Sequence, residues 1–269
     1  MNAFMIAAGV ALLGATLGAG IAWLALRRRA LKPGVAPLAG AFLVIGGAAL
    51  AYVLAAPPLV EAWARDRARA ELMAVPVYVV LDIHEPAVFD KLLAEYTLVV
   101  RDRSRLDIYT DIANSEIGTV ATNRIAHASD AALLALMHDM LDKLQVLREK
   151  SPEDCYRYLF PRAAGRADLA RWFDVESQQR TLALMAEVIR TAAEKPVDVP
   201  TRERVEGLLG PVINGMYAQF GESTALLSHA EDRDVNRKTV CTIATALYEK
   251  VMALPPADAA AVIRSMTQL

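Results

Sequence analysis

Charged residues are almost absent from the first 56 positions of this sequence, and acidic residues are absent there altogether. No charged side chain occurs from Ala3 to Leu26 or from Gly34 to Ala56. Each run exceeds the about 20 residues with which a helix crosses a hydrocarbon core of about 30 Å. A soluble domain would rarely bury two such stretches side by side. The lack of charge therefore predicts two membrane spans, at residues 3–26 and 34–56.

The first run also lacks the marks of a secretory signal peptide. Such a peptide has a basic start, a short apolar middle and a small-residue cleavage site. Here the start, "MNAF", has no charged side chain, the apolar run is long, and three arginines follow it directly. We therefore expect a permanent anchor. Small residues spaced four apart in both runs predict that the two spans pack as a hairpin.

The loop between the two runs, residues 27–33, determines the expected orientation. It carries four basic residues, Arg27, Arg28, Arg29 and Lys32. Lys and Arg in short loops favour the cytoplasmic side of a membrane. The arginines beyond the second run lie farther away and are mixed with acidic residues. The sequence therefore predicts a two-pass protein whose loop faces the cytoplasm and whose two ends lie outside it.

The rest of the chain, residues 57–269, has no surplus of positive charge. Removing the four loop residues from the 29 Lys and Arg of the chain leaves 25, against 31 Asp and Glu, a formal charge of −6. Binding to nucleic acid demands positive charge against the phosphates, so this function class is excluded. The length suits one domain with a sizeable core. The Ala- and Arg-rich composition favours a bacterial protein of the inner membrane, with this domain in the periplasm.

Cysteine is scarce, and both copies, Cys155 and Cys241, lie in the predicted periplasmic domain. Structural disulfides persist in oxidising compartments, so we predict a disulfide between them. Closing a loop of roughly 86 residues would stabilise the fold by about 4 to 5 kcal/mol in the chain-entropy model, less any strain. Two separate buried thiols are the alternative. An unpaired Cys155 near a helix start would be a candidate nucleophile.

Signatures of catalysis are missing too. The four histidines include no pair one helical turn apart with a Glu between them, as in helical zinc proteases. Neither a G-x-S-x-G elbow nor a glycine-rich phosphate loop occurs. We therefore expect no metal and no cofactor, and we assign no catalytic residue. An envelope hydrolase whose site is assembled from scattered Glu, Asp and His remains the alternative.

What the sequence does contain is a strong helical pattern. Apolar residues recur at spacings of three and four over residues 130–150, 201–221 and 235–254. Ser129 or Asp130 can cap the first of these helices. The predicted fold class is therefore all-α, with a transmembrane hairpin over residues 1–56 and a bundle of six to eight helices over residues 57–269.

One stretch, "VPVYVVLDI" at residues 75–83, is ambiguous. Its alternating β-branched residues are typical of a strand, but only residues 96–100 resemble a partner. A lone pair of strands is marginally stable. We therefore expect a short helix or an extended segment that leads into a helix near Pro86.

The stretch "SPEDCYRYLFP", residues 151–161, is the clearest local start of a helix. Ser151 can serve as N-cap, Pro152 fits the first helical position, and Pro161 stops the helix at Phe160. Four nearby aromatic and Arg residues are our candidates for binding a partner: Tyr156, Tyr158, Arg162 and Trp172. The charged run at residues 232–237 is the alternative surface. A purely structural corner, stapled by the disulfide, is the competing interpretation.

These features together favour a non-enzymatic function. We expect a membrane-anchored periplasmic protein that presents a helical surface to another envelope protein. It would be either an accessory subunit of an envelope complex or an immunity protein that inhibits a periplasmic toxin. Its predicted partners are therefore the lipid bilayer and a second envelope protein.

Overall fold

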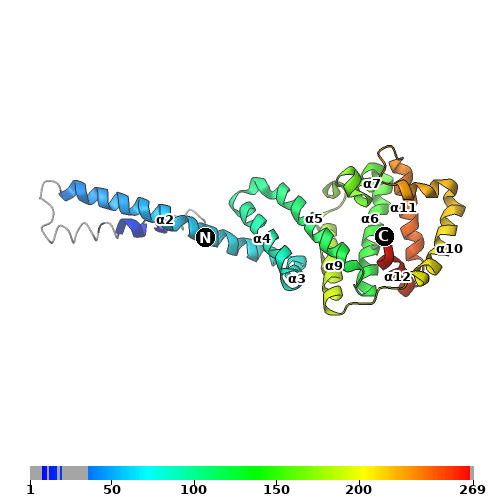
Figure 1. Cartoon of the computed structure of the whole chain (residues 1–269). Coiled ribbons are helices and arrows are strands. Elements are labelled where there is room, and N and C mark those ends of the chain that lie inside the picture. The colour runs from blue at the N-terminus through cyan, green and yellow to red at the C-terminus, as the bar shows by residue number, and fades with distance from the viewer. Residues whose placement is uncertain (1–7, 11, 17–18, 20–35, 267–269) are drawn as a thin grey trace. The chain divides into compact units, whose positions relative to one another are not determined.

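The computed structural model of the protein describes residues 8–10, 12–16, 19 and 36–266 (Figure 1). The described residues are 85% helical, and no strand occurs among them. The all-α fold class is therefore confirmed. The chain divides into two compact units. Unit 1 comprises the residues up to Ala74 together with Asp90–Asp111, and unit 2 comprises Val75–Phe89 together with Ile112–Leu269.

The predicted hairpin is described only in part. Residues 8–10, 12–16 and 19 of the first run are helical, and the second run belongs to helix α2, Ala36–Leu72. The loop at residues 27–33, with Arg27, Arg28, Arg29 and Lys32, lies outside the described residues. The hairpin and its orientation therefore stay predictions.

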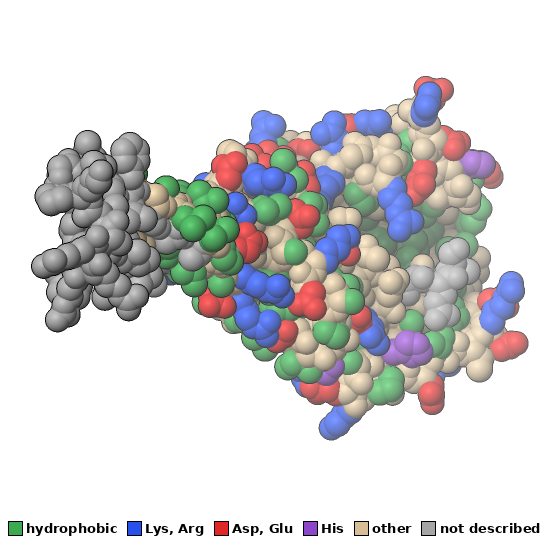
Figure 2. Space-filling model, turned by 60° about the vertical axis from the view of Figure 1, so that its left-hand side comes forward, with side chains coloured by type: hydrophobic (Ala, Val, Ile, Leu, Met, Phe, Trp, Pro, Cys, Tyr) green, Lys and Arg blue, Asp and Glu red, His purple; other side chains and the backbone are tan. Residues whose placement is uncertain are grey.

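Helix α2 is 37 residues long, or about 55 Å at 1.5 Å per residue. Among the described residues, one segment, Val44–Leu72, is long and apolar enough to cross a membrane, with a mean hydropathy of 1.6. Large apolar side chains in the first half of that segment are exposed (Figure 2): Ile45, Leu50, Tyr52, Val53 and Leu54. Pro57 and Pro58 lie within α2, so the predicted boundary at residue 57 falls inside one continuous helix.

Unit 1 is built around the charged second half of α2. Helix α4, Pro86–Arg101, is joined through the short 3-10 helix η1, Arg103–Arg105, to α5, Leu106–Ile125. The Tyr96 hydroxyl donates a hydrogen bond of 2.8 Å to Glu71 near the end of α2. Five residues later, Arg101 is 2.6 Å from Glu61, which lies earlier on α2. These two contacts make α4 antiparallel to α2.

The ambiguous stretch at residues 75–83 is helical. Helix α3, Pro76–His84, begins with proline at its first position, and residues 96–100 belong to α4. A strand would bury residues 77, 81 and 83 on one face, whereas α3 buries Val77, Tyr78 and Leu81 and leaves Ile83 two-thirds exposed. The apolar spacing therefore follows the helical period, and α3 packs against α9, Val175–Glu194.

Unit 2 is a bundle arranged around α6, Asp130–Lys150 (Figure 1). Helix α6 packs against α9, α7 (Pro152–Leu159), α11 (Arg237–Met252) and α12 (Pro256–Met266). The predicted apolar face of α6 is buried, with Leu133, Leu144 and Leu147 fully inaccessible. Ser129 caps α6 as expected, because its side chain accepts the N–H of Ala132 at 3.3 Å.

Residues 57–269 contain more helices than the six to eight expected. Ten α-helices, α3 to α12, follow α2 within the described residues. Proline causes much of the difference, because it suits the first turn of a helix but interrupts the hydrogen bonds of a preceding one. Five of the ten helices begin with proline: Pro76, Pro86, Pro152, Pro161 and Pro256. Helix α10, Arg202–Phe220, instead runs continuously through Pro211.

Candidate partner-binding surface

Helix α7 begins as the sequence predicts. The Ser151 side chain accepts the N–H of Asp154 at 3.3 Å, and its hydroxyl donates to the Asp154 carboxylate at 2.9 Å. Pro152 occupies the first turn, and the helix ends at Leu159 because Pro161 opens the short helix α8, Pro161–Ala164. The start of α7 is therefore fixed by its own residues.

The disulfide partners meet where α7 packs on α11. Cys155 and Cys241 lie at disulfide-bonding distance, with 5.9 Å between their Cα atoms, and both are fully buried. Leu144 and Leu147 of α6 pack around the pair. The predicted disulfide is thus matched by the geometry, and it ties α7 to a helix 86 residues away in sequence.

Tyr156 is not a surface residue. Its side chain is 1% exposed, and its hydroxyl donates a hydrogen bond of 2.7 Å to the carbonyl oxygen of Ala230. The Arg237 guanidinium lies 5.1 Å from the centre of its ring. Burial raises the pKa of Tyr156, so the ring stays neutral inside the fold. The sequence predicted that Tyr156 would contact a partner. Instead, residues 230–240 pack against its side chain and bury it.

Tyr158 and Trp172 are half-buried against the cysteine pair. Burial, with a smaller effect from the negative charge of Asp139, raises the pKa of Tyr158. The Trp172 indole N–H donates to the Asp154 carboxylate at 2.8 Å, and the Arg171 guanidinium lies 4.9 Å from its ring centre. Trp172 is therefore held in one orientation with part of its surface accessible.

The remaining predicted residue, Arg162, is exposed on α8. Gly165, with a φ of 77°, ends that helix in the left-handed region that glycine adopts without steric cost. Residues 157–172 carry four arginines and one acidic residue: Arg157, Arg162, Arg166, Arg171 and Asp168. This segment is thus rich in arginine, and Arg171 lies against the positioned tryptophan.

The alternative candidate surface, residues 232–237, lies beside α7. The Arg237 guanidinium forms an ion pair with Glu153 of α7, and Ala230 binds Tyr156. A pocket of about 430 Å³ opens here, lined by Leu226, His229, Asp232, Arg233, Asp234 and Val235. The two candidate surfaces are therefore neighbours. We name the accessible residues of 153–172 together with 229–237 the α7 surface.

Comparison with known protein families, characterised proteins and solved structures finds no match to this chain.

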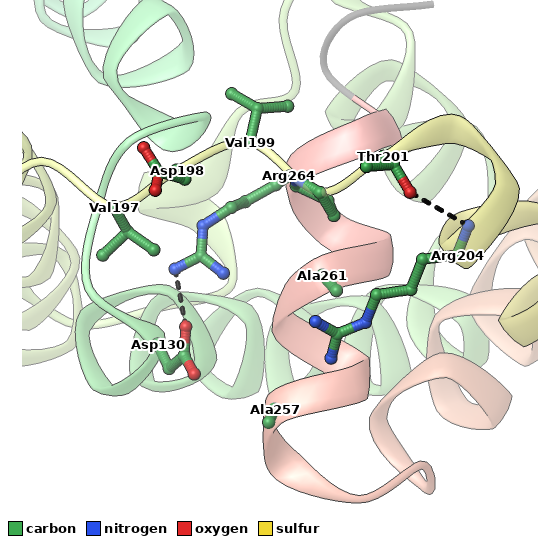
Figure 3. A pocket seen from close by; sticks show the side chains of 10 residues that line it. Asp130, Val197, Asp198, Val199, Thr201, Arg204, Ala257, Ala261 and Arg264 are labelled. Atoms are coloured by element: carbon green, nitrogen blue, oxygen red, sulfur yellow. Dashed lines mark hydrogen bonds and ion pairs between the residues drawn. The ribbon is translucent and has the colours of Figure 1, made fainter.

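A second pocket, of about 340 Å³, lies between α10, α12 and the segment that joins α9 to α10 (Figure 3). The buried Arg264 of α12 reaches Asp130 at 2.6 Å and also binds the carbonyl of Ala128. Arg204 of α10 is 3.1 Å from Asp258. Each arginine thus has a carboxylate partner, and Asp198 adds a further negative charge to the lining. These ion pairs join helices, and the two arginines of the lining are balanced by Asp130 and Asp198, so the pocket has no net positive charge with which to select an anion.

Sequence reasoning missed a buried polar cluster between α6 and α9. Lys143 is 3% exposed and donates to both Asp139 and Thr181, and the Thr181 hydroxyl lies 2.7 Å from the same Asp139 oxygen. The spacing of Asp139 and Lys143, four apart on one helix, was a possible signal. Neither of the two pockets described above is lined by these residues. We interpret the cluster as structural.

Metal binding finds no support in the described residues. Nowhere in residues 8–10, 12–16, 19 and 36–266 do three His, Cys, Asp or Glu side chains gather as a cation would require. His127, His138 and His229, three of the four histidines, are exposed. The most developed site that the structure offers is therefore the α7 surface.

Proposed function

We propose that this protein is a membrane-anchored binding protein of the bacterial inner membrane, whose α7 surface docks on another envelope protein. The observation that carries the proposal is a tryptophan with its orientation fixed by Asp154, in an arginine-rich segment tied to the core through Cys155. Trp and Arg are the residues that most often dominate the energy of protein–protein interfaces. A rigid surface also loses little conformational entropy on binding.

The anchoring half of the proposal is supported by α2. Contact of its exposed apolar side chains between residues 45 and 54 with water is unfavourable in free energy, whereas contact with lipid tails is favourable. The charged residues of α2 begin only at Glu61, so the helix would leave the bilayer near Pro57. A periplasmic position suits the paired cysteines, because that compartment is oxidising.

The role within the envelope is inferred from one part of the α7 surface. Its basic segment, residues 157–172, favours a partner that presents carboxylates. An accessory subunit of an envelope complex and an immunity protein against a periplasmic toxin both fit this description. Both would use the same residues for binding, so one experiment tests either.

Capture of the partner provides that experiment. In native membranes, mild cross-linking of the full chain should yield one dominant adduct. Arg162→Glu should reduce that adduct at least tenfold, because it reverses a charge in the basic segment while leaving an exposed position exposed. Trp172→Phe, which keeps most of the packing but loses the N–H, should reduce it less.

Arg202→Glu is the matched control, because Arg202 is also exposed on a helix of unit 2 but lies outside the α7 surface. It should leave the adduct unchanged. Equal loss with Arg202→Glu and Arg162→Glu would show a non-specific charge effect, and no loss with Arg162→Glu would remove the α7 surface from the proposal.

The orientation is tested separately with a reporter enzyme that is active only outside the cytoplasm. Fused after Leu269, it should be active, whereas a reporter that works only in the cytoplasm should be silent at the same position. Replacing Arg27, Arg28, Arg29 and Lys32 by Gln should shift part of the population to the opposite result. Activity of the cytoplasmic reporter alone in the unmodified chain would reverse the proposed topology.

A further inference from the structure

A second surface stands out in unit 1, at the corner where α4 passes through η1 into α5. Leu106 and Ile108, in the first turn of α5, are both about half exposed. Arg101, Arg103 and Arg105 accompany them within eight residues. Large apolar side chains exposed next to arginines are typical of a surface that contacts a membrane or a partner.

The contacts within unit 1 determine which end of α2 this corner occupies. Arg101 lies 2.6 Å from Glu61, and Glu61 is four residues, or about 6 Å along the helix, beyond Pro57. The polar headgroup layer adds about 5 to 8 Å on each side of the hydrocarbon core. If α2 leaves the core near Pro57, Glu61 and the corner beside it lie at headgroup level.

The direction of α5 brings its first turn to the same end. Tyr109 of α5 packs against Tyr96 of α4, with 4.8 Å between the ring centres. Tyr96 precedes the corner and Tyr109 follows it, so the two helices run antiparallel away from the corner. Side chains on a helix lean toward its N-terminus. Leu106 and Ile108 therefore lean toward the Pro57 end of α2.

The two acidic residues of the corner have local roles. Asp102 accepts the N–H of Ser104 at 3.0 Å and so caps η1, and Asp107 lies in the first turn of α5, where the helix dipole favours a negative charge. Arg101 and Arg103 form ion pairs with Glu61 and Glu71 of α2. Arg105 can lay its aliphatic stem along an apolar surface and extend its guanidinium to a phosphate.

We infer that the corner formed by residues 101–108 rests on the phospholipid headgroups of the bilayer that α2 crosses, with Leu106 and Ile108 inserted among them. This inference rests on the proposed span. It adds a second, peripheral contact that orients unit 1 on the membrane surface.

Site-directed spin labelling of the full chain in phosphatidylglycerol–phosphatidylethanolamine vesicles tests the inference. A nitroxide is attached in turn to Leu54→Cys in the span, Ile108→Cys in the corner and Ala70→Cys on α2. Position 70 is 13 residues, or about 20 Å, beyond Pro57. Collision with oxygen, which concentrates in lipid, is compared with collision with a water-soluble nickel chelate. All three residues are exposed, so labelling leaves the packing intact.

The expected result is an oxygen-to-nickel collision ratio several-fold higher at positions 54 and 108 than at 70. A high ratio at position 54 together with equally low ratios at positions 108 and 70 would overturn the inference while leaving the anchor in place. A low ratio at 54 would overturn the span itself, and with it the corner contact. High ratios at all three positions would mean that α2 lies flat on the membrane, which also contradicts the inference.

Discussion

Reduction of the Cys155–Cys241 pair is expected to lower the thermal midpoint of unit 2 by on the order of 10 °C. The cross-link closes a loop of 86 residues, which contains the end of α7, all of α8, α9 and α10, and the start of α11. In the chain-entropy model such a loop contributes about 4 to 5 kcal/mol by restricting the unfolded chain. Unfolding of the full chain in detergent, followed by far-ultraviolet circular dichroism with and without a phosphine reductant, measures the change.

The reduced wild type is the sharpest comparison, because it keeps both sulfur atoms in the core and removes only the bond. Cys241→Ala adds the loss of buried volume, so it should be less stable than the reduced wild type. Cys241→Ser should also make Cys155 available to thiol reagents once the chain unfolds. Two cysteines that react freely in untreated protein from intact cells would show that the pair is reduced in place.

Lys143→Ala is expected to destabilise the bundle by about 3 to 5 kcal/mol, because it leaves the carboxylate of Asp139 buried without its cation. Asp139 is 8% exposed and Lys143 is 3% exposed, so water cannot replace the missing partner. The Thr181 hydroxyl, 2.7 Å from Asp139, would remain as a neutral polar contact. Denaturant unfolding of the full chain in detergent should show the loss as a lower midpoint.

The double substitution Asp139→Leu with Lys143→Met provides the decisive comparison. Replacing a buried ion pair by apolar residues of similar volume is often neutral or stabilising, so the double variant should recover most of the loss. Arg202→Ala, which breaks an exposed ion pair with Glu206, should cost less than about 1 kcal/mol. A loss of that small size for Lys143→Ala would mean that the cluster is open to solvent.

Local sequence was sufficient to predict the helices whose signals lie close together. Ser129 caps α6 and Ser151 caps α7, and the apolar residues of α6 face the core, because these features depend on residues within one or two turns. The same reasoning underestimated the number of helices, since a proline divides a continuous apolar pattern without changing its period. At residues 75–83 the alternation of valines resembled a strand, and the helix formed because α9 covers the face that α3 buries.

The candidate site was predictable only in part. Its location around α7 followed from the cap, the prolines and the cysteine. The exposure of each side chain did not, because that depends on which distant segment packs against it. Residues 230–240 cover Tyr156, while Arg162 stays open and Trp172 is fixed by Asp154.

The sequence by itself determined the all-helical class, the two uncharged runs and the start and end of α7, since composition and short-range spacing carry that information. Tertiary structure alone decided that residues 229–237 lie beside α7, that Lys143 is buried, and that Leu106 and Ile108 share an end of unit 1 with Glu61. Such contacts join residues up to 84 positions apart, as in the ion pair of Arg237 with Glu153. They arise from the simultaneous packing of many helices, which no local pattern encodes.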